Sequence, residues 1–399
     1  MTDSAQRAVL DGVRVLDFGR YIAGPFCAAL LGDLGAEVIR IERVGGGEDR
    51  WNTPVATGGE GAGFLQWARG KRSLTLNPVA PKGREIVRRL VARSDVVVAN
   101  LPPSTLVSMG LDYATLSAIR PDIVLTTVSA FGGPGPYADR VGFDGVAQAL
   151  SGNMHLTGHP DEPMKNYAPF VDYGTAAFSA LGTVAALLHR KETGRGQHVE
   201  GSLLGTALTM MNATLIEQAL LDKNRIATRN RGQTAAPSDV FRTRDGWILV
   251  SVVGDPLFKR WAALVGEPAW PGDARFASDE ARGEHGELVS ERMQRWCSER
   301  TSAEAVAALE AARIPCGEVL APAQTLRDTH VQAAGFFTAL DYPGTARAAP
   351  VVTPPFRLSQ TPARLRGRAP TLGEHTREIL REIGYSDADA AEFEREGVV

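Results

Sequence analysis

The sequence predicts an α/β protein with a large domain built on a parallel sheet and a second, smaller α+β domain. Strand-like and helix-like segments alternate from Val13 to Val128, which is the pattern of a parallel sheet covered by helices. The composition becomes basic and polar near Lys223, and a hairpin pattern about Asp245-Gly246 follows it. A chain of 399 residues also has room for two domains, at roughly 150 residues each.

Five short apolar segments of the first part are predicted strands, and helical patterns separate them. The strands are Val13–Phe18, Glu37–Glu42, Ser73–Asn77, Asp95–Asn100 and Asp122–Val128, and the helices are Gly24–Leu34, Lys82–Ala92 and Tyr113–Arg120. This order indicates a Rossmann-like sheet, whose ligands bind beyond the carboxyl ends of the strands. Those ends are Phe18-Gly19-Arg20, Glu42-Arg43, Asn100-Leu101 and Ser129-Ala130-Phe131.

The stretch Val171–Leu204 predicts a long helix with a defined start, body and end. Asp172 lies where an N-cap belongs, because its carboxylate can accept hydrogen bonds from first-turn N–H groups. The body, Ala176–Leu188, is apolar on nearly every face and is expected to be buried on all sides. Basic residues and Gly194 then end the helix. A short extended segment, GQHVEGSLL, is expected to run into a further apolar helix at Leu203–Leu221.

Asp172 has two interpretations, and a helix cap is the more common role of an Asp at this position. The preceding run, Gly152–Phe170, is rich in glycine, proline and polar residues and is expected to be a mobile loop. A ligand could therefore reach a carboxylate whose other side is dry. Since first-turn N–H groups favour an anion, Asp172 is expected to be ionised at neutral pH and to be a candidate catalytic residue.

The net charge, the cysteines and the length of the apolar runs argue against several classes of function. A net charge of −3 and a pI near 6.2 predict neither a nucleic-acid partner nor an anionic membrane surface. Cys27, Cys297 and Cys316 have neither the pairing nor the spacing of a disulfide framework or a structural zinc site. No signal-peptide core is visible and the apolar runs are shorter than the ~20 residues that span a bilayer, so a cytoplasmic protein is expected.

Common cofactor motifs do not match either. The segment GRYIAGP after the first strand contains Gly19 and Gly24 but no GxGxxG, and Gly45–Gly47 is expected to be a turn. The sequence has no GxSxG elbow and no P-loop. His155 and His159 have the i,i+4 spacing of metal ligands, but the glycine between them indicates a loop, and no metal site is predicted.

The predicted organisation is a large domain at 1–222, a linker at 223–238, a small α+β domain at 239–325 and a return segment at 326–399 that packs on the large domain. The small domain is expected to combine the hairpin with helices Pro256–Val265, Glu287–Ser298 and Ser302–Ala312 and a strand at Ile314–Leu320.

Seven pieces, in order along almost the whole chain, carry a resemblance to a known family. They are LDGVRVLDFGRYIAGPFCAALLGDLGAEVIRIER (Leu10–Arg43), GKRSLTLN (Gly70–Asn77), VGFDGVAQALSG (Val141–Gly152), VDYGTA (Val171–Ala176), TGRGQHVEGSLL (Thr193–Leu204), IPCGEV (Ile314–Val319) and LGEHTREIL (Leu372–Leu380). The ordered set resembles the class III CoA-transferase family of CaiB/BaiF type, whose members include formyl-CoA transferase and carnitine CoA-transferase-like proteins.

The resemblance implies an enzyme that moves CoA from an acyl-CoA to a small carboxylic acid. The family nucleophile is an Asp at the position of Asp172, which forms an aspartyl anhydride and then an aspartyl-CoA thioester. CoA and acyl-CoA are substrates in this chemistry, and no permanently bound cofactor is implied. The family architecture further implies an interlocked homodimer.

The resemblance also implies contacts to CoA. The matching positions are Ile22, Ala23, Arg43, Leu76, Asn77, Asn100, Leu101, Pro102, Ser129, Ala130 and Phe131. Three positions depart from the family pattern: Ser108 replaces a phosphate-binding Arg of some members, Ser129 replaces a Lys, and Ile22 replaces a Gln that faces the acid in formyl-CoA transferase. Without the resemblance, a surface salt bridge is the simpler interpretation of Arg43.

The residues expected around the acid, Tyr21, Ile22, Phe143 and Tyr167, suggest a pocket more apolar than one for oxalate, for a dicarboxylate or a short branched acid. An acyl-CoA racemase or epimerase of the same fold is the main alternative, but its second base would be a His where this chain has Phe143, beside Asp144. A CoA-binding protein without catalysis is the third hypothesis.

Overall fold

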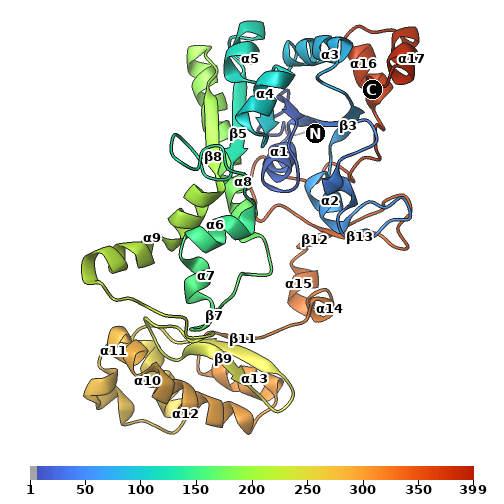
Figure 1. Ribbon diagram of the computed structural model, residues 1–399. Coiled ribbons are helices and arrows are strands. Elements are labelled where there is room, and N and C mark those ends of the chain that lie inside the picture. Colours follow the sequence, from blue (N-terminus) through green and yellow to red (C-terminus); the bar gives the residue numbers. More distant parts are fainter. Residues whose placement is uncertain (1–6) are drawn as a thin grey trace. The chain divides into compact units, whose positions relative to one another are not determined.

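The computed structural model describes residues 7–399, which form two compact units. The first unit comprises the chain up to Ser151, Tyr167–Ala213 and Ala333–Val399, and the second comprises Gly152–Asn166 and Thr214–Gln332. The predicted linker, 223–238, and most of the predicted mobile loop belong to the second unit. Figure 1 labels the elements of both units.

A six-stranded parallel sheet is the centre of the first unit (Figure 1). Its order is β3 (Arg72–Thr75), β2 (Glu37–Glu42), β1 (Arg14–Asp17), β4 (Val96–Ala99), β5 (Val124–Ser129) and β8 (His198–Ser202). All five neighbouring pairs are parallel. The predicted α/β fold is confirmed, and β8 adds a sixth strand to the five predicted ones.

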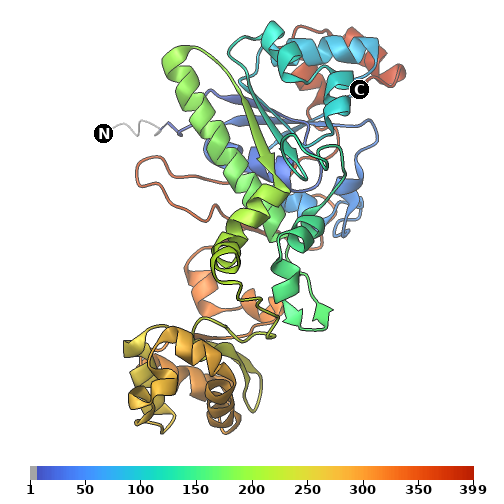
Figure 2. The same cartoon turned by 60° about the vertical axis from the view of Figure 1, so that its left-hand side comes forward.

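Alternating side chains of these strands build two separate cores. Val15 and Val38 face helices α1 (Ala23–Asp33) and α8 (Phe170–Thr193), and α8 lies along β8 (Figure 2). Their neighbours Leu16 and Ile39 face the opposite side. That side is covered by α3 (Pro81–Val91), α4 (Pro103–Met109), α5 (Tyr113–Ile119), α16 (Thr376–Glu382) and α17 (Asp387–Arg395).

Helix α8 is not buried on all sides, so that expectation is wrong for the single chain. Ala176 and Ala180 pack into the core, whereas the exposed fractions of Phe178, Leu181 and Leu188 are 49%, 66% and 60%. By length and composition α8 could cross a membrane, which corrects the statement that no apolar run is long enough. Its packing against the sheet and α1 is that of a core helix.

Apart from α9, the remaining elements of the first unit are short and were not expected from the sequence. In the first unit they are the 3₁₀ turn η1 (Glu48–Trp51), α2 (Ala62–Trp67), α6 (Asp144–Leu150), β12 (Phe337–Leu340) and β13 (Ala349–Val352), and α9 (Leu203–Leu221) begins there. Helix α9 has the predicted bounds.

The second unit has the expected α+β character. An antiparallel sheet of order β11 (Cys316–Glu318), β10 (Trp247–Ser251) and β9 (Ser238–Arg242) includes the predicted hairpin. Around it are α10 (Asp255–Leu264), η2 (Trp270–Gly272), η3 (Ala274–Phe276), α11 (Asp279–Glu284), α12 (Gly286–Ser298) and α13 (Ser302–Ala311). Two short helices, α14 (Pro322–Thr325) and α15 (Thr329–Ala333), follow β11 in the chain. Within Gly152–Phe170 the chain forms α7 (Asn153–Leu156) and the two-stranded β6 (Gly158–His159) and β7 (Glu162–Pro163).

Candidate active site

The loop that follows β1 is held by side chains from three strand ends. The backbone N–H of Gly19 donates to Asp17 Oδ1 at 2.8 Å, and Arg40 donates to the Gly19 carbonyl at 3.2 Å. The side chain of Asn100 accepts from the Arg20 N–H at 2.6 Å and donates to the Arg20 carbonyl at 2.8 Å. Because both peptide groups are fixed, the start of α1 has a defined position.

The two glycines of GRYIAGP permit this loop to pack closely. A Cβ on Gly19 would lie 2.7 Å from Pro25 Cδ, and a Cβ on Gly24 would lie 3.1 Å from Asn100 Oδ1. A side chain on Gly19 would therefore clash with Pro25, and one on Gly24 would crowd Asn100. The glycines allow the loop to contact α1 and β4, which accounts for them without a dinucleotide fingerprint.

A buried group of charges lies beneath the loop. Lys71 Nζ donates to Asp17 Oδ2 at 2.7 Å and to the Pro25 carbonyl at 2.6 Å, and Arg40 lies 3.3 Å from the same carboxylate oxygen. Burial lowers the pKa of Lys71 to about 8 against the attraction of Asp17. Burial alone would raise the pKa of Asp17, but Lys71 and Arg40 lower it overall. Paired in this way, the charges form a fixed support for the loop.

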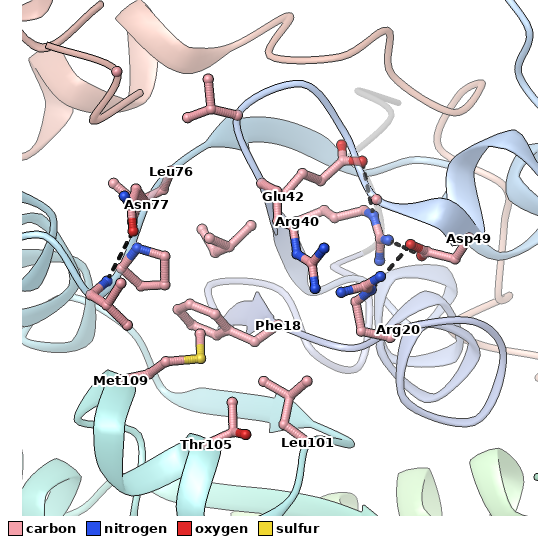
Figure 3. A pocket seen from close by; sticks show the side chains of 17 residues that line it. Phe18, Arg20, Arg40, Glu42, Asp49, Leu76, Asn77, Leu101, Thr105 and Met109 are labelled. Atoms are coloured by element: carbon pink, nitrogen blue, oxygen red, sulfur yellow. Dashed lines mark hydrogen bonds and ion pairs between the residues drawn. The ribbon is translucent and has the colours of Figure 1, made fainter.

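A cavity of about 410 Å³ opens beyond the carboxyl ends of β1 to β4 (Figure 3). Arginine and carboxylate side chains form one wall, and Phe18, Leu101 and Met109 form an apolar wall. Its lining residues are Phe18, Arg20, Arg40, Ile41, Glu42, Arg43, Val44, Gly47, Asp49, Leu76, Asn77, Pro78, Val79, Leu101, Thr105, Met109 and Gly397. Four predicted CoA contacts, Arg43, Leu76, Asn77 and Leu101, are therefore brought together.

Four other predicted CoA contacts do not line this cavity, although they lie close in sequence to residues that do: Ile22, Ala23, Asn100 and Pro102. Ile22 and Ala23 begin α1, Asn100 holds the loop, and Pro102 precedes α4. Ala23 packs in one apolar cluster with Val171, beside Asp172.

The three predicted residues at the end of β5, Ser129, Ala130 and Phe131, lead into a turn that is separate from the lining of the cavity. Ser129 Oγ accepts from the Gly132 N–H at 3.0 Å, and the Ala130 carbonyl accepts from the Leu204 N–H at 2.9 Å. The Phe131 ring packs edge-on against Tyr137, with ring centres 5.7 Å apart.

Asp172 is the third residue of α8, not its N-cap, so the predicted capping role is wrong. The N–H groups of Val171 and Asp172 donate to Asp144 Oδ2 at 2.8 and 3.1 Å. Asp144 is buried at the start of α6, and Gln148 donates to its other oxygen. A carboxylate 28 residues earlier in the chain therefore caps the helix.

This arrangement changes the expected charge state of Asp172. Burial, followed by repulsion from the Asp144 carboxylate, raises the pKa of Asp172 to about 7. The expectation that first-turn N–H groups keep Asp172 ionised is wrong, because Asp144 accepts from those groups. Close to neutral pH, Asp172 therefore exchanges between a neutral acid and a carboxylate that is more basic than usual.

Aromatic side chains enclose the same region. The Tyr173 ring packs edge-on against Phe26 at 4.9 Å, and its hydroxyl donates to Gln66 at 2.8 Å. The ring of Phe143, next to Asp144, contacts Tyr21 at 5.4 Å. The starts of α1, α6 and α8 thus converge on Asp172. The residues of this group that were not predicted for the site are Phe26, Gln66, Asp144 and Tyr173, although all but Gln66 lie in matched motifs.

The comparisons with known proteins agree with this geometry. The profile of the family "CoA-transferase family III" matches residues 10–376. The chain belongs to this family. It is 34% identical to succinyl-CoA–D-citramalate CoA-transferase of Chloroflexus aurantiacus, over 98% of both chains. It is 33% identical to succinate–glutarate CoA-transferase of Agrobacterium fabrum, over 96% of this chain and 98% of the relative.

Solved structures show the same fold. A CaiB/BaiF family protein from Brucella suis aligns with a TM-score of 0.83 and 32% identity, over 95% of this chain and all of the other. Rv3272 from Mycobacterium tuberculosis aligns with a TM-score of 0.81 and 29% identity, over 94% and 99%. The predicted family and enzyme class are confirmed: the protein is a class III CoA-transferase.

The raised pKa of Asp172 predicts a pH-dependent cost to stability. In the unfolded chain an Asp ionises near pH 4, but in the folded protein Asp172 does so near pH 7. Stability is therefore lost as pH rises between these values and is not regained above them. The Asp172→Asn variant should gain stability over the wild type as pH rises from 4 to 8, as urea unfolding at each pH can measure. A difference that does not vary with pH would contradict the raised pKa.

Proposed function

We propose that this CoA-transferase uses Asp172 as a covalent nucleophile toward acyl-CoA. The observation that carries the proposal is the half-buried Asp172 carboxylate, which lies against the Asp144 charge at the convergence of three helix starts. Acylation converts Asp172 into a neutral group. Because burial and repulsion penalise only the charged carboxylate, the acylated state is favoured relative to the free one.

The reaction proceeds by carboxylate and thiolate exchange alone. An Asp172 oxygen attacks the thioester carbonyl and the C–S bond breaks. CoA leaves as a thiolate, and a mixed anhydride of Asp172 and the donor acid remains. The thiolate attacks the Asp172 carbonyl and releases the donor acid, leaving an aspartyl-CoA thioester. The acceptor carboxylate attacks this thioester and forms a second anhydride, and the thiolate then takes the acceptor acyl group and frees Asp172. In each step one carboxylate or thiolate forms a bond to the carbonyl carbon and another leaves with the electron pair of the bond that breaks.

The cavity beyond β1 to β4 is proposed to hold the nucleotide part of CoA. Its apolar wall suits an adenine ring and its arginine wall suits phosphates. The segment Arg20–Ile22 runs from this cavity to the residues beside Asp172. The pantetheine arm of CoA is proposed to follow the same direction, so that the thioester reaches Asp172. Of the predicted CoA contacts, Arg43, Leu76, Asn77 and Leu101 line the cavity and Ile22 and Ala23 lie on this path, whereas Ser129, Ala130 and Phe131 do not line the cavity.

Short dicarboxylic acids are the proposed substrates. Relatives at 33 to 35% identity are named for succinyl-CoA with malate or citramalate, and for succinate with glutarate. Ile22 and the aromatic rings of Tyr21 and Phe143 favour an acid larger than oxalate. Succinyl-CoA is therefore the first donor to test. CoA enters and leaves as a substrate, so no resident cofactor is proposed, and the three free cysteines are consistent with a cytoplasmic location.

Label transfer tests the role of Asp172. Wild-type protein should move CoA from succinyl-CoA to isotope-labelled free acids, detected by mass spectrometry of the CoA pool. Asp172→Ala and Asp172→Asn should each lower the rate by a factor on the order of 10⁴ or more, because the nucleophile is lost. Sustained transfer by a sequence-verified Asp172→Ala protein would contradict the mechanism.

The same incubation in deuterated water separates the racemase alternative. Phe143 packs against Tyr21 and cannot move a proton, so a 2-methylacyl-CoA should gain no deuterium at its α-carbon. Uptake that depends on Asp172 would favour a racemase, and neither transfer nor uptake would favour a CoA-binding protein without catalysis.

A homodimer is proposed from the resemblance and from the uncovered side of α8. Phe178, Leu181 and Leu188 are exposed there, and Leu208 and Met210 of α9 are also exposed. Apolar side chains grouped in this way favour burial against a second copy.

Light scattering on the purified wild type should give twice the chain mass of 42.6 kDa. Leu181→Lys should shift the protein toward monomer, because a charge would enter the proposed interface, whereas Val107→Lys, at an equally exposed residue of α4, should not. A wild-type monomer at micromolar concentration would contradict the proposal.

A further inference from the structure

Arg20 lines the cavity with a guanidinium group that is fixed at one edge. Its Nε donates to Asp49 Oδ1 at 3.3 Å, and Asp49 is buried and also pairs with Arg40. Its backbone is held on both sides by Asn100. Only 21% of the Arg20 side chain is exposed, so the orientation of its outer edge is set by the fold.

Glu48 joins that outer edge to a second arginine. One of its carboxylate oxygens contacts Arg20 Nη2, and the other lies 3.2 Å from Arg43 Nη1. Glu48 and Arg43 side chains are both 63% exposed, in contrast to Asp49. A single exposed carboxylate therefore lies between two guanidinium groups that line the cavity.

We propose that Arg20 is a phosphate-binding residue of the CoA site, and that Glu48 holds the position that a CoA phosphate takes on binding. The inference rests on the proposed use of the cavity for CoA. A phosphate presents paired oxygens to a guanidinium fork as a carboxylate does, but carries more charge. The pair of Arg20 and Arg43 with their shared carboxylate is thus a preformed phosphate site with an internal competitor.

The charges around the cavity single out these two arginines. Arg40 also lines it, but its guanidinium is buried and already paired with Asp17 and Asp49. Only Arg20 and Arg43 have their outer edges paired with an exposed partner. Ion pairs to an exposed partner contribute little to stability, so a phosphate can displace Glu48 at small cost.

The backbone before Glu48 suits such a displacement. Gly45 and Gly46 adopt left-handed φ angles of 89° and 86°, and Glu48 begins the 3₁₀ turn η1. Glycines accept such angles without strain, and they place Glu48 over the rim of the cavity. The run Gly45–Gly47, which matches no nucleotide motif, therefore helps to position Glu48.

The test compares succinyl-CoA with succinyl-pantetheine, a donor that has the same thioester but lacks the nucleotide phosphates. The quantity measured is kcat/KM for succinyl-CoA divided by kcat/KM for succinyl-pantetheine. Arg20→Gln should lower this ratio on the order of tenfold, because a charge-assisted contact to phosphate is lost. Glu48→Gln should raise the same ratio several-fold. A purely structural role of Arg20 would reduce both donors equally and leave the ratio unchanged.

Glu37→Gln is the matched control. Glu37 also bridges two arginines, Arg14 and Arg72, but it lies at the opposite end of β2, away from the cavity. The ratio should not change in this variant. An unchanged ratio in Arg20→Gln, or a lower one in Glu48→Gln, would overturn the inference.

Failure of this inference and failure of the proposed function give different results. If the wild type transfers CoA but the ratios do not respond, only the inference fails. If the wild type transfers no CoA, calorimetric binding of CoA still decides the question: Arg20→Gln should weaken it and Glu48→Gln should strengthen it. Equal affinity of the wild type and both variants would then overturn the inference as well.

Discussion

The contact between the Asp144 carboxylate and the first N–H groups of α8 is the interaction on which the site depends. It fixes the start of α8 against α6 and so determines where Asp172 lies. Burial is the main cause of the raised pKa of Asp172, and the Asp144 charge beside it raises that pKa further. The Asp144 carboxylate therefore both positions Asp172, the proposed nucleophile, and adds to the cost of its charged form.

A second constraint concerns the loop after β1. Gly19 and Gly24 allow the loop to pack against β4 and α1, and the buried charges of Asp17, Lys71 and Arg40 hold it there. The same loop contributes Arg20 to the cavity and Tyr21 to the aromatic contacts near Asp144. The cavity beyond β1 to β4 and the surroundings of Asp172 are thus connected through one fixed segment of the first unit.

Much of this could be predicted from local patterns. The strand at Glu37–Glu42 and the helix at Leu203–Leu221 have the bounds that their apolar patterns predict, and the end of α8 at Gly194 follows from the usual helix stop. The cap of α8 could not be predicted, because its donor and acceptor are far apart in the sequence and Asp172 satisfies the local rule equally well. The exposed side of α8 was missed for a related reason: an apolar side chain buried by another part of the same chain and one left uncovered look alike in a sequence.

The central claim is that Asp172 becomes covalently acylated. The most direct test is to incubate the protein with succinyl-CoA and no acceptor acid, add hydroxylamine, and locate the modified residue by mass spectrometry of the peptide that contains Asp172. A hydroxamate on Asp172 is expected, together with release of free CoA. Repeated labelling of another side chain, or CoA transfer with no modification of Asp172 under conditions that trap a control acyl-enzyme, would contradict it.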